Sequence, residues 1–87
     1  TTEIYTLSLH DALPISTAEQ SPRIFVDGPK GELYILFAKG AIVQVLPKTY
    51  EMKLIATAPG PIKAGGDYAH GRIFFVSGSH LMSYKLK

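Results

Sequence analysis

The feature that most constrains the fold is a series of short, apolar, β-forming segments separated by glycine and proline turns. Residues 32–37 are apolar on both faces, which is typical of a strand buried between two layers. Turn sequences such as Lys39-Gly40 and Ser77-Gly78-Ser79 separate the segments, and no window of useful length has helical spacing. We therefore predict an all-β antiparallel meander of about seven short strands. The predicted strands are residues 23–27, 32–37, 41–46, 52–57, 62–64, 72–76 and 80–86.

The chain also repeats itself with a period near 40 residues. Residues 31–36 match the pattern of residues 71–76 at an offset of 40. After the next turn, residues 42–45 match residues 81–84 at an offset of 39, so one residue was gained or lost between them. A repeat of this length predicts two similar units, the first with four strands and the second with three.

Four short antiparallel strands in a repeat near 40 residues resemble the blades of β-propellers. The resemblance implies that residues 17–87 are the C-terminal part of a larger propeller, with residues 23–58 as one blade and 61–87 as an incomplete last blade. Its partners would be the N-terminal blades of the same chain. The missing fourth strand of the last blade would come from the N-terminal end of a closed ring. The alternative is a gene cut at this end. The chain has no Trp, so the subfamily stays open.

The first fifteen residues, Thr1 to Ile15, stand apart from this pattern. The string resembles, residue for residue, one translated reading frame of a universal adapter oligonucleotide used in short-read DNA sequencing. We therefore interpret residues 1–16 as adapter-derived and not native. This interpretation places the native N-terminus upstream and leaves the cellular compartment open. Residues 17–87 then have nine basic and five acidic residues, a net charge of +4.

Interpreted as protein, the same stretch predicts a turn at residues 11–15 and a short strand with four apolar residues, Ile4, Tyr5, Leu7 and Leu9. Because the segment is foreign, we expect it to make few contacts or to lie as an added strand at a sheet edge. His10 and Asp11 are no general-base pair, since neighbouring residues of a strand point to opposite faces.

The most polar cluster is Asp67, Tyr68 and His70, which follows Gly65-Gly66. Loops at the mouth of a propeller bind ligands, so these three residues are the candidate ligand-binding residues. The alternative is a turn, in which Asp bonds nearby N–H groups and Gly supplies positive φ. Asp27 lies at the equivalent point of the first repeat, which favours the turn.

Other chemistries lack their sequence patterns. The chain has no Cys, and His70, His80 and Asp67 match no compact zinc spacing, so we predict no metal site. Nucleophile-elbow and phosphate-loop patterns are absent, so we predict no catalytic residue and no cofactor. The lysines are dispersed, and no apolar run approaches membrane-spanning length, so we expect neither nucleic acid nor a membrane as partner. Five aromatic residues are expected in the core: Phe25, Tyr34, Phe37, Phe74 and Phe75.

The expected role is structural: the two units close a larger ring and pack on neighbouring blades, with no activity in the fragment alone. Two alternatives stay open. The parent protein is a secreted propeller enzyme that acts on carbohydrate, as a hydrolase or a lyase, or it is a protein-interaction scaffold. Since about three repeats are usually needed to bury their faces, residues 17–87 alone should be marginally stable.

Overall fold

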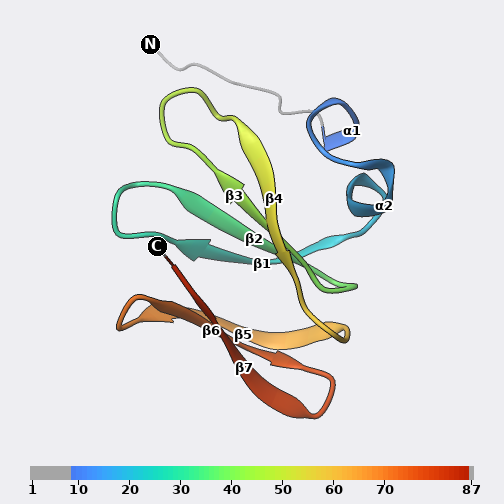
Figure 1. Ribbon diagram of the computed structural model, residues 1–87, viewed down its shortest axis with the longest axis vertical. Coiled ribbons are helices and arrows are strands. Elements are labelled where there is room, and N and C mark those ends of the chain that lie inside the picture. The colour runs from blue at the N-terminus through green and yellow to red at the C-terminus, as the bar shows by residue number, and fades with distance from the viewer. Residues whose placement is uncertain (1–8, 87) are drawn as a thin grey trace.

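The computed structural model describes residues 9–86, apart from the side chains of His10 and Asp11. Two short helices precede seven strands (Figure 1). The elements are α1 (Leu9–Ala12), α2 (Ile15–Ala18), β1 (Pro22–Asp27), β2 (Leu33–Phe37), β3 (Ala41–Val45), β4 (Met52–Thr57), β5 (Ile62–Ala69), β6 (Arg72–Ser77) and β7 (His80–Lys85). The strands form an open four-stranded sheet of order β1-β2-β3-β4 and an open three-stranded sheet of order β5-β6-β7, with antiparallel neighbours throughout. The predicted all-β class and the division into four and three strands are confirmed.

Glycines close the hairpins where the sequence predicts turns. Gly40, between β2 and β3, has a φ of 116° and donates its N–H to the carbonyl of Phe37 at 3.0 Å. Its own carbonyl accepts the N–H of Ala58 at 2.7 Å. A Cβ at this position would lie 2.8 Å from the Ala58 carbonyl oxygen, so only glycine fits here.

Strand β5 is longer than predicted. It continues from Ile62 through Gly65-Gly66 to Ala69, where the sequence predicts a strand at 62–64 and then a loop. The pairing of β5 with β6 shifts register between Gly65 and Asp67, and both glycines have φ near 100°. A β-bulge at two glycines therefore lets the strand continue past a sequence that resembles a turn.

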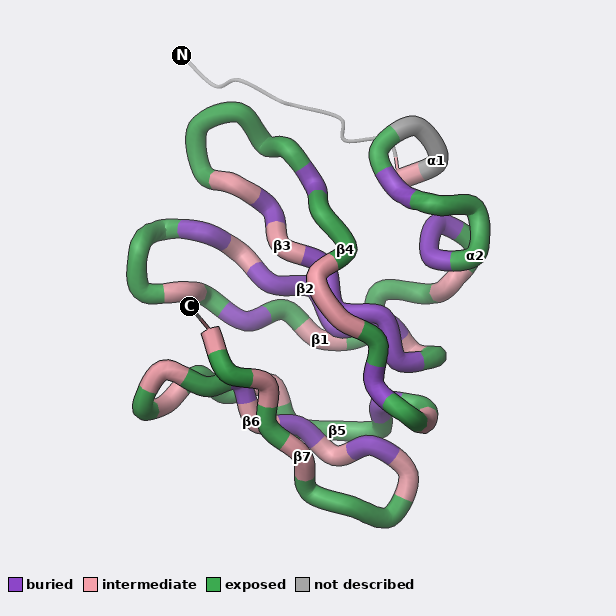
Figure 2. The backbone as a smooth tube through the Cα atoms, viewed as in Figure 1, coloured by how far each residue is buried: buried purple, intermediate pink, exposed green. Residues whose placement is uncertain are grey.

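The four-stranded sheet has two apolar faces, because β2 and β3 are buried almost throughout (Figure 2). The inner face packs against the three-stranded sheet; its buried residues are Val26, Tyr34, Leu36 and Ile42. The outer face lies on the opposite side; its residues are Leu33, Ile35, Phe37, Ala41, Val43, Val45 and Met52. The sheets approach each other through their first strands, since β1 contacts β5.

The two sheets pack face to face. Ile73 and Phe75 of the three-stranded sheet pack against the inner face, and at the 40-residue offset they correspond to Leu33 and Ile35 of the outer face. Met82, which also packs there, is equivalent to Val43. The inner face of the four-stranded sheet thus contacts the face of the three-stranded sheet that corresponds, at this offset, to the outer face. We call this arrangement head to tail. Such a heterologous contact leaves one surface of each kind open at the ends of the stack.

The N-terminal segment covers part of the outer face. Leu13 is 6% exposed and Ala18 is 8% exposed, and both belong to the same apolar cluster as Phe37 and Val43. The turn predicted at residues 11–15 is wrong in detail, since α1 and α2 form on either side of Pro14. The expectation of few contacts is also wrong for Leu13. An uncovered apolar sheet face gains free energy by burying any apolar segment within reach.

Three further sequence expectations concern single residues. The strand predicted through Ile4, Tyr5, Leu7 and Leu9 lies outside the described residues except for Leu9, where it is wrong because Leu9 begins α1. Phe25 was expected in the core but is 60% exposed, because its partner Ile35 places it on the outer face at an edge strand that the helices do not reach. The other four aromatic residues expected in the core are buried or half-buried: Tyr34, Phe37, Phe74 and Phe75.

We predict that Gly66→Ala destabilises the fold far more than Gly71→Ala. A Cβ on Gly66 would overlap the side chain of Ile24 in β1, whereas one on Gly71 would meet nothing within 4 Å. Both glycines have positive φ, so the conformational cost of about 1 kcal/mol applies to each. Steric overlap adds a further 1 to 3 kcal/mol, roughly, for Gly66 alone. Urea unfolding followed by circular dichroism measures both; equal losses would contradict the bulge packing.

We predict that Leu13→Ala lowers the free energy of unfolding by about 2 to 3 kcal/mol, as expected for a buried leucine. Ile15→Ala is the matched control, because Ile15 is 70% exposed, and its effect should stay within about 0.5 kcal/mol. Thermal and urea unfolding of the 87-residue chain compare the two. A neutral Leu13→Ala would show that the segment does not cover the outer face.

Candidate functional site

The structure places Asp67 and Tyr68 in strand β5 and His70 in the turn that follows it. Asp67 pairs with Phe74 and Tyr68 with Ile73, so the two side chains point to opposite faces of the sheet. All three residues are exposed, and His70 has a positive φ of 52°. Within the described residues, none of the three side chains hydrogen-bonds to another group. The strand therefore separates Asp67 from Tyr68, so these two side chains do not face one another, and ligand binding by the three residues stays a prediction.

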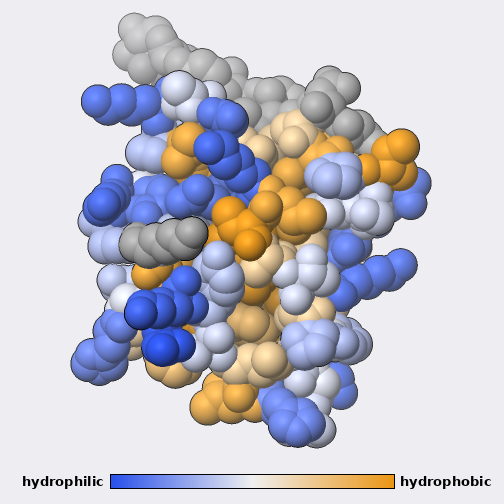
Figure 3. All heavy atoms as spheres, viewed as in Figure 1, coloured by the Kyte–Doolittle hydropathy of each residue, from blue (hydrophilic) through white to orange (hydrophobic). Residues whose placement is uncertain are grey.

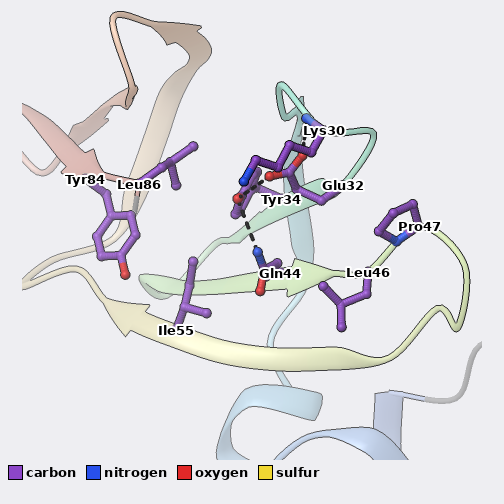
Figure 4. A pocket seen from close by; sticks show the side chains of 9 residues that line it. All are labelled: Lys30, Glu32, Tyr34, Gln44, Leu46, Pro47, Ile55, Tyr84 and Leu86. Atoms are coloured by element: carbon purple, nitrogen blue, oxygen red, sulfur yellow. Dashed lines mark hydrogen bonds between the residues drawn. The ribbon is translucent and has the colours of Figure 1, made fainter.

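A pocket of about 540 Å³ lies between the two sheets (Figure 4). One wall is polar, and the other side is formed largely by apolar and aromatic groups. Its residues are Lys30, Glu32, Tyr34, Gln44, Leu46, Pro47, Ile55, Tyr84 and Leu86. The volume is in the range of small-ligand sites. The pocket is thus a second candidate site, which the sequence patterns did not indicate.

A chain of hydrogen bonds orders the polar wall. The Lys30 backbone N–H donates to Oε1 of Glu32 at 2.7 Å. The Tyr34 hydroxyl donates to Oε2 of the same carboxylate at 3.0 Å and accepts a hydrogen bond from Nε2 of Gln44 at 3.3 Å. Tyr34 and Gln44 are cross-strand partners on β2 and β3, so the sheet register holds this chain in place.

The hydrogen bonds set the charge state of the wall. Burial acts to raise the pKa of the Glu32 carboxyl, but hydrogen bonds from its own N–H, the Lys30 N–H and the Tyr34 hydroxyl outweigh it. The positive charge of Lys30 adds to them, and the pKa falls below its ordinary value. Burial raises the pKa of Tyr34, and the neighbouring carboxylate raises it further against the opposing effect of Gln44. At neutral pH Glu32 is therefore ionised and Tyr34 protonated.

Three polar groups of the pocket keep unused hydrogen-bonding capacity. Within the described residues, the Lys30 amine and the Tyr84 hydroxyl donate no hydrogen bond. The Gln44 amide uses one N–H on Tyr34, which fixes the amide orientation and turns its carbonyl oxygen away from that bond (Figure 4). The pocket therefore offers donors on Lys30, Tyr84 and the second N–H of Gln44, and an acceptor on the Gln44 carbonyl, around an ionised carboxylate.

A groove of about 490 Å³ forms an extension of the outer face. It is almost wholly apolar and includes the exposed Phe25 beside Leu33, Ile35 and Pro47. Apolar surface also gathers around β4 and the short helices (Figure 3), where Leu54 and Ile15 are exposed. The outer face is thus larger than the area that α1 and α2 cover, and it offers an apolar contact surface without catalytic groups.

Comparisons with known proteins give no relative. No protein-family model matches the chain, and no curated protein or solved structure matches it. Among the described side chains, no three His, Asp or Glu residues are placed to hold a metal ion. Neither helix in residues 9–86 is long and apolar enough to cross a membrane. Function must therefore be inferred from the sheets and the pocket themselves.

Sequence reasoning missed Glu32, Tyr34 and Gln44, although a signal was present. Gln44 is the one polar residue in an apolar five-residue strand, and Glu32 directly precedes another apolar strand. Polar residues at inward positions of neighbouring strands need partners, since burying them alone costs free energy. Aligning the two strands in an antiparallel hairpin would have brought Tyr34 and Gln44 together.

We predict that Glu32 makes the fold sensitive to acid. Its pKa is lowered in the folded chain, so its stabilising contribution is present above the unfolded-state pKa and is lost as pH falls through the folded-state pKa. Glu32→Gln should therefore cost about 1 to 2 kcal/mol at pH 7 and little near pH 3. The exposed Glu51 supplies the control Glu51→Gln, which should parallel the unmutated chain. Urea unfolding across this pH range tests both; parallel curves for all three would contradict the assignment.

Proposed function

We propose that residues 17–87 form two consecutive blades of a larger β-propeller and act as structural units that pack on further sheets. The head-to-tail stack carries this proposal. The face of the three-stranded sheet that is equivalent to the outer face packs against the inner face. The outer face is therefore the surface on which the inner face of a preceding unit would pack, and its residues have the composition of a sheet interface.

The opposite end of the stack supports the same arrangement. Phe74 and Val76, the equivalents of the inward Tyr34 and Leu36, are only half-buried. Leu81, the equivalent of Ile42, is 74% exposed. These residues would be covered by the outer face of a following unit. A stack with two complementary free ends either closes into a ring or continues as a filament, and the propeller is the closed form.

The edge of β7 supports the addition of one strand. Strand β3 pairs with both β2 and β4, whereas β7 pairs with β6 alone within residues 9–86. The N–H of Leu86 bonds to the carbonyl of Gly71, and this register directs the backbone groups of Leu81, Ser83 and Lys85 away from β6. A fourth strand on this edge would complete the second unit in the way that β4 completes the first.

We propose further that residues 1–16 are the translated adapter and replace part of the native covering of the outer face. Leu9 and Leu13 lie on the same cluster as Phe37 and Val43, which is where a preceding sheet would pack. A foreign apolar segment can bind such a face because burial of apolar area is non-directional. This accounts for a buried Leu13 in a segment that the resemblance assigns to an oligonucleotide.

Duplication of the repeat tests the proposed function. The tandem chain consists of residues 17–61 followed directly by residues 22–87, so that the added first copy takes the place of the helices on the outer face. The junction joins Pro61 to position 22, because position 22 corresponds at the 40-residue offset to position 62, which follows Pro61 in the natural chain. We expect the tandem chain to gain at least about 2 kcal/mol over residues 17–87, since burying even one large apolar side chain contributes that much.

The matched control places Ile42→Lys in the added copy alone. Ile42 is 1% exposed on the inner face, so the change should abolish docking of the added copy while leaving the original two sheets intact. Urea midpoints of residues 17–87, the tandem chain and the control chain are compared. A tandem chain no more stable than residues 17–87, or one whose gain survives Ile42→Lys, would contradict head-to-tail stacking.

A further inference from the structure

The pocket between the sheets has the features of a ligand site that the structural role does not require. An interface whose only task is to hold two sheets together is favoured by apolar contacts, and buried polar groups weaken it unless they are fully bonded. Here the inner face carries an ionised carboxylate, a phenol and an amide at one end, beside an open volume of about 540 Å³. Elsewhere between the sheets the buried cluster consists mainly of apolar side chains, and the buried Ser77 hydroxyl donates to the Gly60 carbonyl.

The polar wall is rigid before any ligand arrives. Glu32 is 9% exposed and Tyr34 is 3% exposed, and each is held by the hydrogen bonds described above. Tyr34 in turn orients Gln44, so the Gln44 carbonyl oxygen has a fixed direction. Prearranged groups lose little conformational entropy on binding, which favours affinity for a small molecule.

The charges of the pocket favour a neutral ligand. Glu32 contributes a negative charge and Lys30 a positive one, and the two interact. A cation would meet the positive charge of the Lys30 amine beside the carboxylate. An anion would meet the Glu32 carboxylate. Neither sign of charge is favoured overall, so the ligand is one recognised by hydrogen bonds and shape.

The remaining groups of the pocket favour a ligand with an amphipathic ring. The Gln44 carbonyl accepts one hydroxyl hydrogen, and the Lys30 amine and Tyr84 hydroxyl can donate to hydroxyl oxygens. Figure 4 shows Tyr84 and Leu86 on the other side of the pocket from the bonded wall, and Ile55 on β4 below it. The Tyr84 ring and the two aliphatic side chains offer an apolar surface for C–H groups. A saturated ring with several hydroxyl groups on its edge and C–H groups on its faces fits both walls.

We propose that this pocket binds a monosaccharide unit, with Gln44, Lys30 and Tyr84 as its hydrogen-bonding residues and Tyr84 also as its stacking surface. The site lies wholly within the two described sheets, so it does not depend on a ring or on further blades.

The test is a titration of the ¹⁵N-labelled 87-residue chain, followed by ¹H–¹⁵N NMR, with glucose, galactose, mannose and N-acetylglucosamine. We expect at least one sugar to shift the Gln44 side-chain amide and the backbone signals of Tyr84 and Leu86. For a single ring with few bonds, we expect a Kd of about 1 to 10 mM. Inorganic phosphate and ammonium chloride are the charged probes, and they should leave these signals unchanged.

Two variants remove single groups without opening the core. Lys30 is exposed, so Lys30→Met removes the amine, and Tyr84→Phe removes only the hydroxyl. Each should weaken sugar binding about three- to tenfold, as expected for the loss of one hydrogen bond. Tyr68→Phe is the matched control on an exposed tyrosine outside the pocket, and it should leave the Kd unchanged.

Three results would overturn the proposal. The first is the absence of shifts with every sugar at about tenfold the expected Kd. The second is a set of shifts outside the pocket, or binding that both pocket variants leave unchanged. The third is stronger binding of phosphate or ammonium at the same residues, which would assign the pocket to a charged ligand.

Discussion

The contact between the inner face of the four-stranded sheet and the three-stranded sheet determines the rest of the structure. Leu36, Ile42 and Ile73 are almost completely removed from solvent there, and each is worth roughly 1.5 to 3 kcal/mol by area burial. The three-stranded sheet contributes to this contact the face that corresponds to the outer face of the four-stranded sheet. The contact therefore joins two different faces and has a direction. On the sides away from this contact, the four-stranded sheet carries the apolar outer face and the three-stranded sheet carries the exposed Leu81.

The secondary structure follows from local signals in the sequence. Gly40 and Gly78 close hairpins where the sequence predicts turns, and both have positive φ. The apolar β2 and β3 are buried on both faces, as successive apolar residues predict. The failures involve partners distant in the sequence. β5 extends through Gly65-Gly66 because β1 packs close against the bulge, and a strand pattern alone does not reveal this approach.

The candidate site shows the same division between local and distant information. Asp67, Tyr68 and His70 lie close in sequence, but a strand directs the first two to opposite faces. The polar wall of the pocket joins Lys30, Glu32, Tyr34 and Gln44 across a hairpin, and its other side comes from β7, about fifty residues further along. Proximity in sequence therefore did not predict that Asp67 and Tyr68 point to opposite faces, and sheet register brings together a pocket lining that no motif describes.

The central claim is that the two sheets belong to a longer head-to-tail stack and that residues 1–16 are foreign to it. Sequencing of the genomic DNA upstream of the codon for Ser16 tests both parts directly. The account predicts that the fifteen adapter-like codons are absent. It also predicts a further unit of about 40 residues upstream, with apolar residues at the positions equivalent to Leu36, Ile42 and Phe37. A genomic reading frame that retains those fifteen codons and begins at a start codon just before them would contradict it.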